Sequence, residues 1–379
     1  MGNKPIIAGT IFLGAAIILG LVFWLVREKD GSSEDISIPM QPEIPVLESK
    51  NSLTQNPVPE VVAQDLDIPW ELVFLPDGSM LVTERVGNLV RLRNDTEERM
   101  IISGVEHRGE GGLLGMALHP DFENNGFLYL YLTTAEGGGL SNRVERYVFD
   151  MENNVLSQKT AIINGIPGAA NHDGGRIAFD PDGFLYVATG DAGRESSAQY
   201  TDSLAGKILR LEDDGNIPED NPFGNAVYSY GHRNVQGLAW DDEGRLWATE
   251  HGRSGILSGY DELNLIEKGK NYGWPEIQGD ETRSGMEKPV AHSGASATWA
   301  PSGAAYRDGS IFFAGLRGEA LYEYEISENR ITEHFKSIFG RLRNAVSAPD
   351  GSLYIITNNT DGRGNPKSGD DKIIKTGSF

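Results

Sequence analysis

Six copies of one short phrase divide the chain after about residue 60. Each copy is an apolar run, a turn of the Pro-Asp-Gly kind and then an alternating apolar strand. The copies cover residues 75–84, 119–134, 180–191, 241–251, 307–315 and 348–359, and their turn glycines are Gly78, Gly126, Gly183, Gly244, Gly309 and Gly351. Each phrase predicts a β-hairpin, because Asp-Gly readily adopts the positive φ that a tight turn needs.

The spacing of these hairpins predicts the architecture. Successive turn glycines are 48, 57, 61, 65 and 42 residues apart, and a period near 50 residues is the size of one four-stranded propeller blade. We therefore predict an all-β domain over residues 61–379, a six-bladed β-propeller of four-stranded antiparallel blades. A solenoid of β-hairpins is the alternative that the same spacing leaves open.

The first 60 residues differ from the rest. Residues 6–26 carry no charge, and as a helix they would reach about 30 Å, the thickness of a bilayer's hydrocarbon core. We predict one N-terminal transmembrane helix within residues 1–30, with a cleaved signal as the alternative. Residues 31–60 contain several prolines and serines and are predicted to be a flexible linker. The propeller would lie on the extracytoplasmic side, or be secreted if the segment is cleaved.

Charge and cysteine content exclude several classes of function. The formal net charge is −22 and the pI about 4.7, so the surface repels nucleic acid and anionic lipid headgroups, and no nucleic-acid partner is expected. The chain has no cysteine, which excludes disulfides, thiolate zinc sites and cysteine nucleophiles. An uncharged substrate such as a sugar is little affected by this charge.

The repeat also predicts where a site would form. Within a hairpin, residues before the first strand and after the second lie at the same end, opposite the turn. Distinctive residues fall there in nearly every copy, so we expect them to converge on one face of the ring. They are Trp70, Glu84, Glu110, Asn171, His172, Asp191, Arg233, Asn234, His251, Gly252, Pro301, Ser302, Arg317, Arg341, Arg343 and Asn358.

Some of these side chains suit particular chemistry. His172 lies in the phrase NHDGGR. The imidazole of a histidine can accept a proton at neutral pH. Arg341 and Arg343 are two residues apart, which puts them on the same side of an extended chain. With Arg317 they suit a ligand with several carboxylates, although a surface arginine pair with acidic partners is the alternative. The acidic segment 248–281 offers oxygen ligands of the kind calcium prefers.

Several phrases resemble one known family. EGGLLGMALHPDF, NHDGGR, YGHRNVQGLAW, DELNLIEKGKNYGWP and RLRN, in this order, are similar to the soluble glucose dehydrogenases and aldose sugar dehydrogenases that depend on pyrroloquinoline quinone (PQQ), also called glucose/sorbosone dehydrogenases. The resemblance runs from about residue 61 to 379. It implies a six-bladed propeller that uses PQQ and Ca²⁺ to oxidise aldose sugars at C1 to lactones. The electron acceptor, the physiological sugar and the oligomeric state stay open.

The resemblance also implies roles for individual residues. His172 would be the general base, and Arg233 would stabilise negative charge on the quinone oxygen. The remaining roles are cofactor binding by Asn234, Arg317, Arg341 and Arg343, sugar binding by Glu110, one calcium ion on the carbonyls of Gly252 and Arg253, and a second calcium ion on Glu262, Tyr272 and an acid near Asp280. The sequence departs from the family pattern at Arg253, where proline is common, and at Arg317, which replaces a lysine in some members. Short loops around the sugar pocket suit broad aldose specificity.

Two other functions fit the same fold. A calcium-dependent lactonase would need carboxylates converging on the metal, for which Glu84, Glu110 and Asp191 are candidates, but it gives the arginines no role. A non-catalytic binding propeller would lack the base or the arginines, and this chain has both. Fold alone does not separate these functions.

Overall fold

The computed structural model describes residues 58–94, 96–253 and 259–377, and these residues contain six four-stranded antiparallel sheets. The predicted six-bladed, all-β architecture is confirmed. The predicted transmembrane helix, and the linker up to residue 57, lie outside the described residues. Among the residues that are described, no helix is long and apolar enough to cross a membrane.

Each sheet is one blade, and three blades come from the first half of the domain. Blade 1 contains β2 (Pro69–Phe74), β3 (Met80–Glu84), β4 (Asn88–Arg93) and β5 (Thr96–Ile101). Blade 2 contains β6 (Leu113–Leu118), β7 (Phe127–Glu136), β8 (Gly139–Asp150) and β9 (Val155–Gly168), with the short helix α1 (Phe122–Asn125) between β6 and β7. Blade 3 contains β10 (Ile177–Phe179), β11 (Leu185–Ala188), β12 (Lys207–Leu211) and β13 (Val227–Tyr230), with a 3₁₀ turn, η1 (Glu195–Gln199), before β12.

The second half supplies the other three blades. Blade 4 contains β14 (Val235–Trp240), β15 (Leu246–Glu250), β16 (Glu262–Ile266) and β17 (Ala291–His292). Blade 5 contains β18 (Pro301–Arg307), β19 (Ser310–Gly315), β20 (Leu321–Glu325) and β21 (Arg330–His334). Blade 6 contains β22 (Leu342–Ser347), β23 (Leu353–Thr357), β24 (Ile373–Lys375) and, as its outer strand, β1 (Glu60–Ala63).

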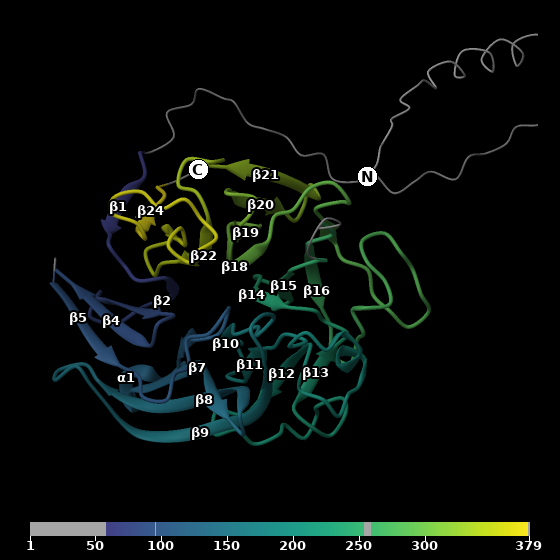
Figure 1. Cartoon of the computed structure of the whole chain (residues 1–379), viewed down its shortest axis with the longest axis horizontal. Coiled ribbons are helices and arrows are strands. Elements are labelled where there is room, and N and C mark those ends of the chain that lie inside the picture. Colours follow the sequence, from purple (N-terminus) through teal and green to yellow (C-terminus); the bar gives the residue numbers. More distant parts are fainter. Residues whose placement is uncertain (1–57, 95, 254–258, 378–379) are drawn as a thin grey trace, which may run out of the picture. The chain divides into compact units, whose positions relative to one another are not determined.

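The first described strand closes the ring. β1 pairs antiparallel with β24, with Val61 opposite Ile374, so residues that precede blade 1 complete blade 6. Figure 1 shows the blades arranged around a common centre, with β2, β10, β14, β18 and β22 nearest to it. Backbone hydrogen bonds thereby tie the two ends of the domain together, and the strand edges are protected as radial repetition requires.

The predicted hairpin turns are present in all six blades. The six turn glycines join the first two strands of each blade and have φ between 65° and 89°, a range that side chains with a Cβ rarely adopt. Acidic residues brace the turns. In blade 1, the Asp77 carboxylate accepts hydrogen bonds from the backbone N–H and the hydroxyl of Ser79, at 3.0 and 2.6 Å. In blade 1, local side-chain chemistry therefore fixes the turn between the two innermost strands.

The core is divided into six apolar clusters, one between each pair of neighbouring blades. The cluster between blades 6 and 1, for example, joins the fully buried Ile356 of β23 to Val82 of β3. Since each blade buries both faces against its neighbours, its strands contain nearly continuous apolar runs. This packing fixes the angle between blades and hence the positions of the loops at the ring's mouth.

The innermost strands bulge at the end opposite the turn. The pairing register shifts there in blades 1, 2, 4, 5 and 6. A bulge re-aims side chains, and three of the affected residues meet at the centre. Nη1 of Arg343 donates to Oε1 of Gln236 at 3.0 Å and to Oγ of Ser302 at 3.2 Å. The bulges thus bring polar groups from three blades together near the axis.

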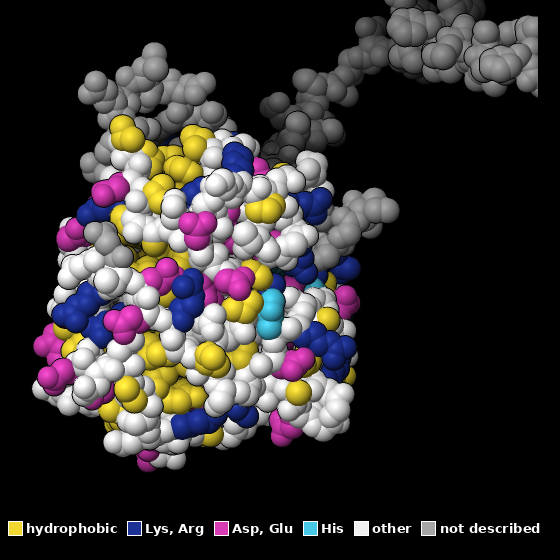
Figure 2. All heavy atoms as spheres, turned by 60° about the vertical axis from the view of Figure 1, so that its left-hand side comes forward, with side chains coloured by type: hydrophobic (Ala, Val, Ile, Leu, Met, Phe, Trp, Pro, Cys, Tyr) yellow, Lys and Arg dark blue, Asp and Glu magenta, His cyan; other side chains and the backbone are white. Residues whose placement is uncertain are grey.

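Charges of both signs are mixed on the surface. Figure 2 shows Lys and Arg side chains scattered among Asp and Glu, and the described part of this face has no continuous basic patch.

Candidate active site

The end of the ring opposite the turns gathers the residues that the repeat predicts. His172 lies in the loop between β9 and β10, and its side chain is 13% exposed. Asp191, from the loop after β11, is fully buried, and its Oδ1 lies 2.8 Å from Nδ1 of His172. The backbone at Gly190 makes this approach possible, because a Cβ there would lie 1.9 Å from the carbonyl oxygen of His172. The loop that connects blades 2 and 3 and a loop of blade 3 therefore build an Asp–His pair.

The other ring nitrogen faces an arginine of the next blade. Nη2 of Arg233 lies 2.8 Å from Nε2 of His172. A guanidinium only donates, so Nε2 carries the lone pair and Nδ1 carries the proton that it donates to Asp191. Burial opposes ionisation of Asp191, but the hydrogen bonds from His172, Gly193 and Trp274 hold the pKa of its carboxyl below the usual value. These contacts hold His172 as the tautomer whose accepting nitrogen, Nε2, faces Arg233.

Arg233 is itself held in place. Its backbone N–H donates to Oε1 of Glu250, whose other oxygen accepts from His232. Its guanidinium lies 5.3 Å from the centre of the Trp274 ring, and the Trp274 N–H donates to Oδ2 of Asp191 at 2.9 Å. The base, its orienting carboxylate and the cation are therefore parts of one hydrogen-bonded assembly.

Glu110 closes the assembly from blade 2. Its Oε2 accepts from the backbone N–H of His172 at 2.8 Å, and its Oε1 pairs with Nη1 of Arg363 at 2.8 Å. Although burial alone would raise it, these contacts lower the pKa of Glu110 to about 2. Arg363 lies between β23 and β24, so this ion pair links blades 6 and 2. It places a permanently ionised carboxylate beside the base.

Arg341 and Arg343 both lie at this mouth, in different electrostatic settings. Nη2 of Arg341 pairs with the buried Asp361 at 2.9 Å. Arg343 has uncharged partners, Gln236, Ser302 and Asn358. Burial, together with the neighbouring Arg85 and Arg341, lowers the pKa of Arg343 to about 9. A buried cation without a carboxylate partner in the described residues is suited to a bound anion.

Two buried side-chain amides, like Arg343, point to a bound ligand that accepts hydrogen bonds. The side-chain N–H groups of Asn234 and Asn358 donate to nothing, and the residues are 1% and 0% exposed. The carbonyl oxygen of Asn234 is already used by the N–H of Gly174. Unsatisfied buried donors are uncommon in native proteins, so these donors fit an acceptor-rich ligand between His172 and Arg343.

Comparison with known proteins agrees with this geometry. The family model described as Glucose / Sorbosone dehydrogenase matches residues 66–366. The chain belongs to the glucose/sorbosone dehydrogenase family. Aldose sugar dehydrogenase YliI of Escherichia coli is 33% identical over 343 residues, which cover 80% of this chain and 90% of that protein. The PQQ-bound aldose sugar dehydrogenase of Streptomyces coelicolor superposes with a TM-score of 0.77 at 42% identity, covering 84% of this chain and 97% of that one.

A third relative has a shorter match. Quinoprotein glucose dehydrogenase B of Acinetobacter calcoaceticus is 34% identical over 261 residues, 60% of this chain and 54% of that protein. The resemblance seen in the sequence is confirmed, and membership in the glucose/sorbosone dehydrogenase family makes this chain a sugar oxidoreductase on a PQQ-type propeller.

Not every expected residue of this dehydrogenase joins the site. Trp70 is buried beneath the arginines, with its ring 4.2 Å from the Arg176 guanidinium. Glu84 is fully buried and binds Arg99 and Asn88, so it is not placed to serve as the metal ligand that a lactonase would need. Arg317, by contrast, lies at the edge of the site: it is exposed and follows Leu316, whose carbonyl accepts from Arg341. Among the described residues, Glu84, Glu110 and Asp191 therefore do not form the carboxylate cluster that the lactonase alternative needs.

The first predicted calcium site has close-packed backbone oxygens. A Cβ on Gly252 would lie 2.2 and 2.3 Å from the carbonyl oxygens of Gly259 and Tyr260, and the Gly252 N–H donates to Asp261. The carbonyl of Arg253 accepts from the N–H of Gly259 at 3.3 Å. Residues 254–258 lie outside the described residues. Within the described ranges, no group of three or more His, Asp or Glu side chains is arranged to hold a metal.

The second predicted calcium site is partly assembled. Glu262 pairs across the strands with His292, whose Nε2 lies 3.3 Å from Asp280. Burial and the neighbouring Glu250 raise the pKa of Glu262. The Tyr272 hydroxyl points elsewhere and donates to the carbonyl of Leu265 at 2.6 Å. Glu262 and Asp280 therefore share one neighbourhood, and the Tyr272 side chain is not part of it.

Sequence reasoning missed several residues of the site. Asp361 and Arg363 belong to the phrase TDGRGN, whose Asp-Gly turn follows the last predicted strand and is a local signal. Arg85 directly follows Glu84, is buried, and donates to His107 at 3.4 Å. Trp274 lies in the phrase NYGWP, and the resemblance implies no role for it.

Proposed function

We propose that this dehydrogenase oxidises aldose sugars at C1 to lactones, with PQQ and Ca²⁺ as cofactors. The observation that carries the proposal is the line Asp191–His172–Arg233, which fixes the imidazole tautomer with its lone pair on Nε2, directed at the Arg233 guanidinium. The unsatisfied amides of Asn234 and Asn358 and the buried Arg343 support a planar, carboxylated, oxygen-rich cofactor. These donors fit PQQ.

His172 is the general base in this proposal. Its Nε2 takes the proton of the anomeric hydroxyl, and the Asp191 carboxylate stabilises the imidazolium that results. Glu110, ionised at neutral pH, accepts a hydrogen bond from another sugar hydroxyl. PQQ, when bound, supplies the acceptor for the hydride that leaves C1.

Arg233 provides electrostatic stabilisation. Glu250 accepts from its backbone N–H, and its guanidinium lies over the Trp274 ring before substrate arrives, so little reorganisation is needed to stabilise a developing oxyanion. Asn234 and Asn358 would donate to cofactor oxygens, and Arg341, Arg343 and Arg317 would neutralise its carboxylates. The carbonyls around Gly252 would hold a calcium ion, a Lewis acid in such a site.

Reconstitution tests the proposal. The purified full-length protein is titrated with PQQ in calcium and in a chelator, and dye reduction is followed with a panel of aldoses. We expect calcium-dependent reduction with several sugars. Absence of PQQ binding together with absence of dye reduction, in protein whose melting curve shows a folded domain, would contradict the assignment.

We also propose that residues 6–26 anchor the propeller in a membrane, with the domain on the extracytoplasmic side. The support is the uncharged length of this segment. Fractionation of cells with an alkaline wash tests it: anchored protein stays in the membrane pellet, and a variant lacking residues 1–30 should be released. Recovery of the complete chain in the wash would contradict the anchor.

A further inference from the structure

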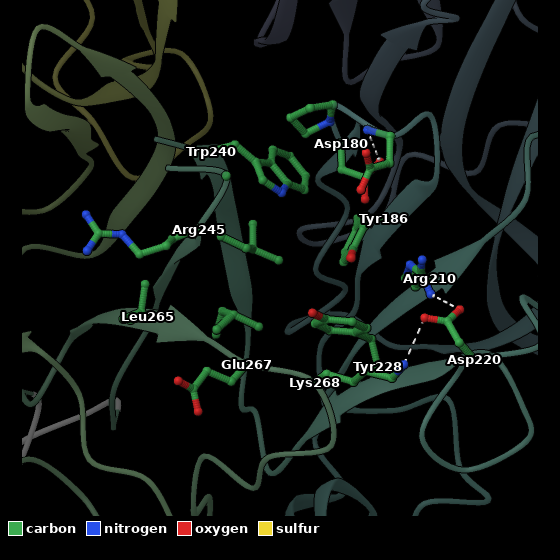
Figure 3. Close-up of a pocket in the computed structure, with 15 residues that line it drawn as sticks. Asp180, Tyr186, Arg210, Asp220, Tyr228, Trp240, Arg245, Leu265, Glu267 and Lys268 are labelled. Carbon is green, nitrogen blue, oxygen red and sulfur yellow. Dashed lines mark hydrogen bonds and ion pairs between the residues drawn. The ribbon is translucent and has the colours of Figure 1, made fainter. Parts of the chain in front are cut away.

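A cavity between blades 3 and 4 opens at the end of the ring that carries the hairpin turns, opposite His172. It has a volume of about 400 Å³. Its aromatic wall is formed by Tyr186 of β11, Tyr228 of β13 and Trp240 of β14. Figure 3 shows these three rings and the Asp180 carboxylate around the space. We call it the blade 3/4 cavity.

The three rings form adjacent sides of a box. Tyr228 and Trp240 each meet Tyr186 in an edge-to-face arrangement, with centroids 5.1 and 5.2 Å apart and interplanar angles of 72° and 74°. Leu246, Leu265 and Ile266 supply apolar surface on the blade 4 side. Aromatic rings set at steep angles around one space can present their negative faces to one bound ligand. Substituted ammonium groups bind to rings arranged in this way.

The charges around the cavity favour a cation as that guest. Arg210 and Lys268 both pair with Asp220, at 2.7 and 2.8 Å. Arg245 pairs with Asp241 at 2.7 Å, and Figure 3 shows its guanidinium turned away from the space. The basic residues of the lining therefore already have carboxylate partners.

Asp180 is a lining carboxylate that makes no direct ion pair within the described residues, although the charge of nearby Arg210 favours its ionised form. It is 9% exposed, and its Oδ1 accepts from the backbone N–H groups of Asp182 and Phe184. Its Oδ2 forms no hydrogen bond or ion pair with the described residues, and burial raises the pKa of this carboxyl. A carboxylate of a largely buried residue whose second oxygen is open to the cavity (Figure 3) is stabilised by a positive ligand there.

The next blade offers a direct comparison. Asp241 occupies the corresponding place in the turn of blade 4, and its Oδ1 likewise accepts from two backbone N–H groups, those of Glu243 and Arg245. Its Oδ2, however, is satisfied by Arg245 at 2.7 Å and by the Trp247 N–H at 2.8 Å. The same turn therefore has a complete set of partners in blade 4 and an open acceptor in blade 3.

We propose that the blade 3/4 cavity binds a small organic cation with a fully substituted ammonium group, enclosed by Tyr186, Tyr228 and Trp240 and neutralised by Asp180. This site is separate from the sugar-oxidising site, at the other end of the ring, and needs no quinone. Attraction to the ring faces acts over the whole substituted nitrogen, so the site would prefer a quaternary ammonium to a neutral molecule of the same shape.

Calorimetric titration of the full-length protein tests the proposal with a pair of matched probes. Choline carries the charge, and 3,3-dimethyl-1-butanol has the same shape without it. We expect one choline per chain and at least tenfold weaker binding of the neutral alcohol. Equal affinity for both probes, or no heat with millimolar choline, would overturn the cation assignment.

Variants assign the binding to this cavity. Asp180→Asn keeps the oxygen that accepts from the turn's N–H groups and removes the charge, and Trp240→Leu removes one ring while keeping apolar volume. Each should weaken choline binding at least tenfold, whereas Asp350→Asn, a turn carboxylate of blade 6 that binds Ser352 and Lys375 and does not line the cavity, should leave it unchanged. Melting curves identify any variant that fails to fold. Unchanged affinity in folded Asp180→Asn or folded Trp240→Leu protein would refute the site.

Discussion

Nδ1 of His172 donates to Oδ1 of Asp191 across 2.8 Å, and this contact decides which nitrogen of the ring is basic. Since Arg233 donates to the other nitrogen, the tautomer is fixed from both sides. The two residues are only 19 positions apart, yet their contact depends on the curvature of blade 3.

Removal of the base should stop turnover without loss of the cofactor. We expect His172→Gln to lower kcat by roughly 10²–10⁴-fold, the range typical of general base catalysis, while PQQ affinity changes little. Asp191→Asn should fall in the same range, because an amide can present its N–H to Nδ1 and favour the wrong tautomer. Steady-state kinetics and quinone titration measure both. His119→Gln, at the opposite end of the ring, is the control, and full activity of His172→Gln would remove the residue from its role.

The two arginines should contribute unequally to cofactor binding. Arg341 is already neutralised by Asp361, whereas Arg343 has only uncharged partners. We expect Arg343→Gln to weaken PQQ binding by about 30-fold or more, equivalent to about 2 kcal/mol, and Arg341→Gln to weaken it less. Quinone titration by absorbance gives both constants. A larger loss in Arg341→Gln would show that the ion pair with Asp361 opens when the cofactor binds.

Arg363 should act on sugar affinity more than on stability. Its side chain is 56% exposed, so its ion pair with Glu110 contributes about 1 kcal/mol or less. A sugar hydroxyl has to compete with Arg363 for Oε1 of Glu110. We therefore expect Arg363→Ala to lower KM severalfold, with kcat within about twofold and an unchanged melting temperature. A raised KM would mean that Arg363 itself holds the sugar.

Asp173 should make the folded state less stable as the pH rises. Burial, with a smaller effect from nearby Glu110, raises the pKa of Asp173 to about 6, and its Oδ2 has no partner. The folded protein therefore keeps a proton that the unfolded chain, with a carboxyl pKa near 4, has already lost. Between these two values the folded state binds more protons, so this residue's contribution to stability falls with rising pH and is constant above about pH 6.

The matched variant isolates this effect. Asp173→Asn keeps an oxygen to accept from Asn142 and from the N–H of Ala169, but it has no charge. Relative to the variant, the parent protein should lose about 2 kcal/mol of unfolding free energy between pH 4 and pH 7. Denaturant unfolding at a series of pH values measures this difference. A constant difference would show that Asp173 is ionised throughout.

The hairpin phrases predicted the number of blades and the location of the site as well as the strands. Gly78 and its five counterparts mark the innermost turn of each blade, so they gave the number of blades and the end of the ring where His172, Asp191 and Arg233 lie. The same reasoning placed Glu84 and Trp70 at the site, and there it was incomplete, because position along a hairpin does not specify the direction of a side chain. Glu84 turns to Arg99, and Trp70 lies beneath Arg176.

Other features have no signal within any one repeat. Arg363 meets Glu110 across 253 residues of sequence, and β1 completes a blade whose other strands lie nearly 300 residues later. The blade 3/4 cavity depends on Tyr186 and Trp240 approaching from different blades. These contacts form only when the ring closes. Closure brings different blades into contact, and the repeated sequence pattern contains no information about which residues of different blades meet.

The amino-acid sequence by itself determined the blades, their number and the common end at which the distinctive residues gather, because turn chemistry and strand alternation act over a few residues. Only the tertiary structure decided which nitrogen of His172 is basic, which arginine lacks a counter-charge and which turn carboxylate is left open. Each of these depends on distances of a few ångströms between blades, and those distances are set by packing around the whole ring.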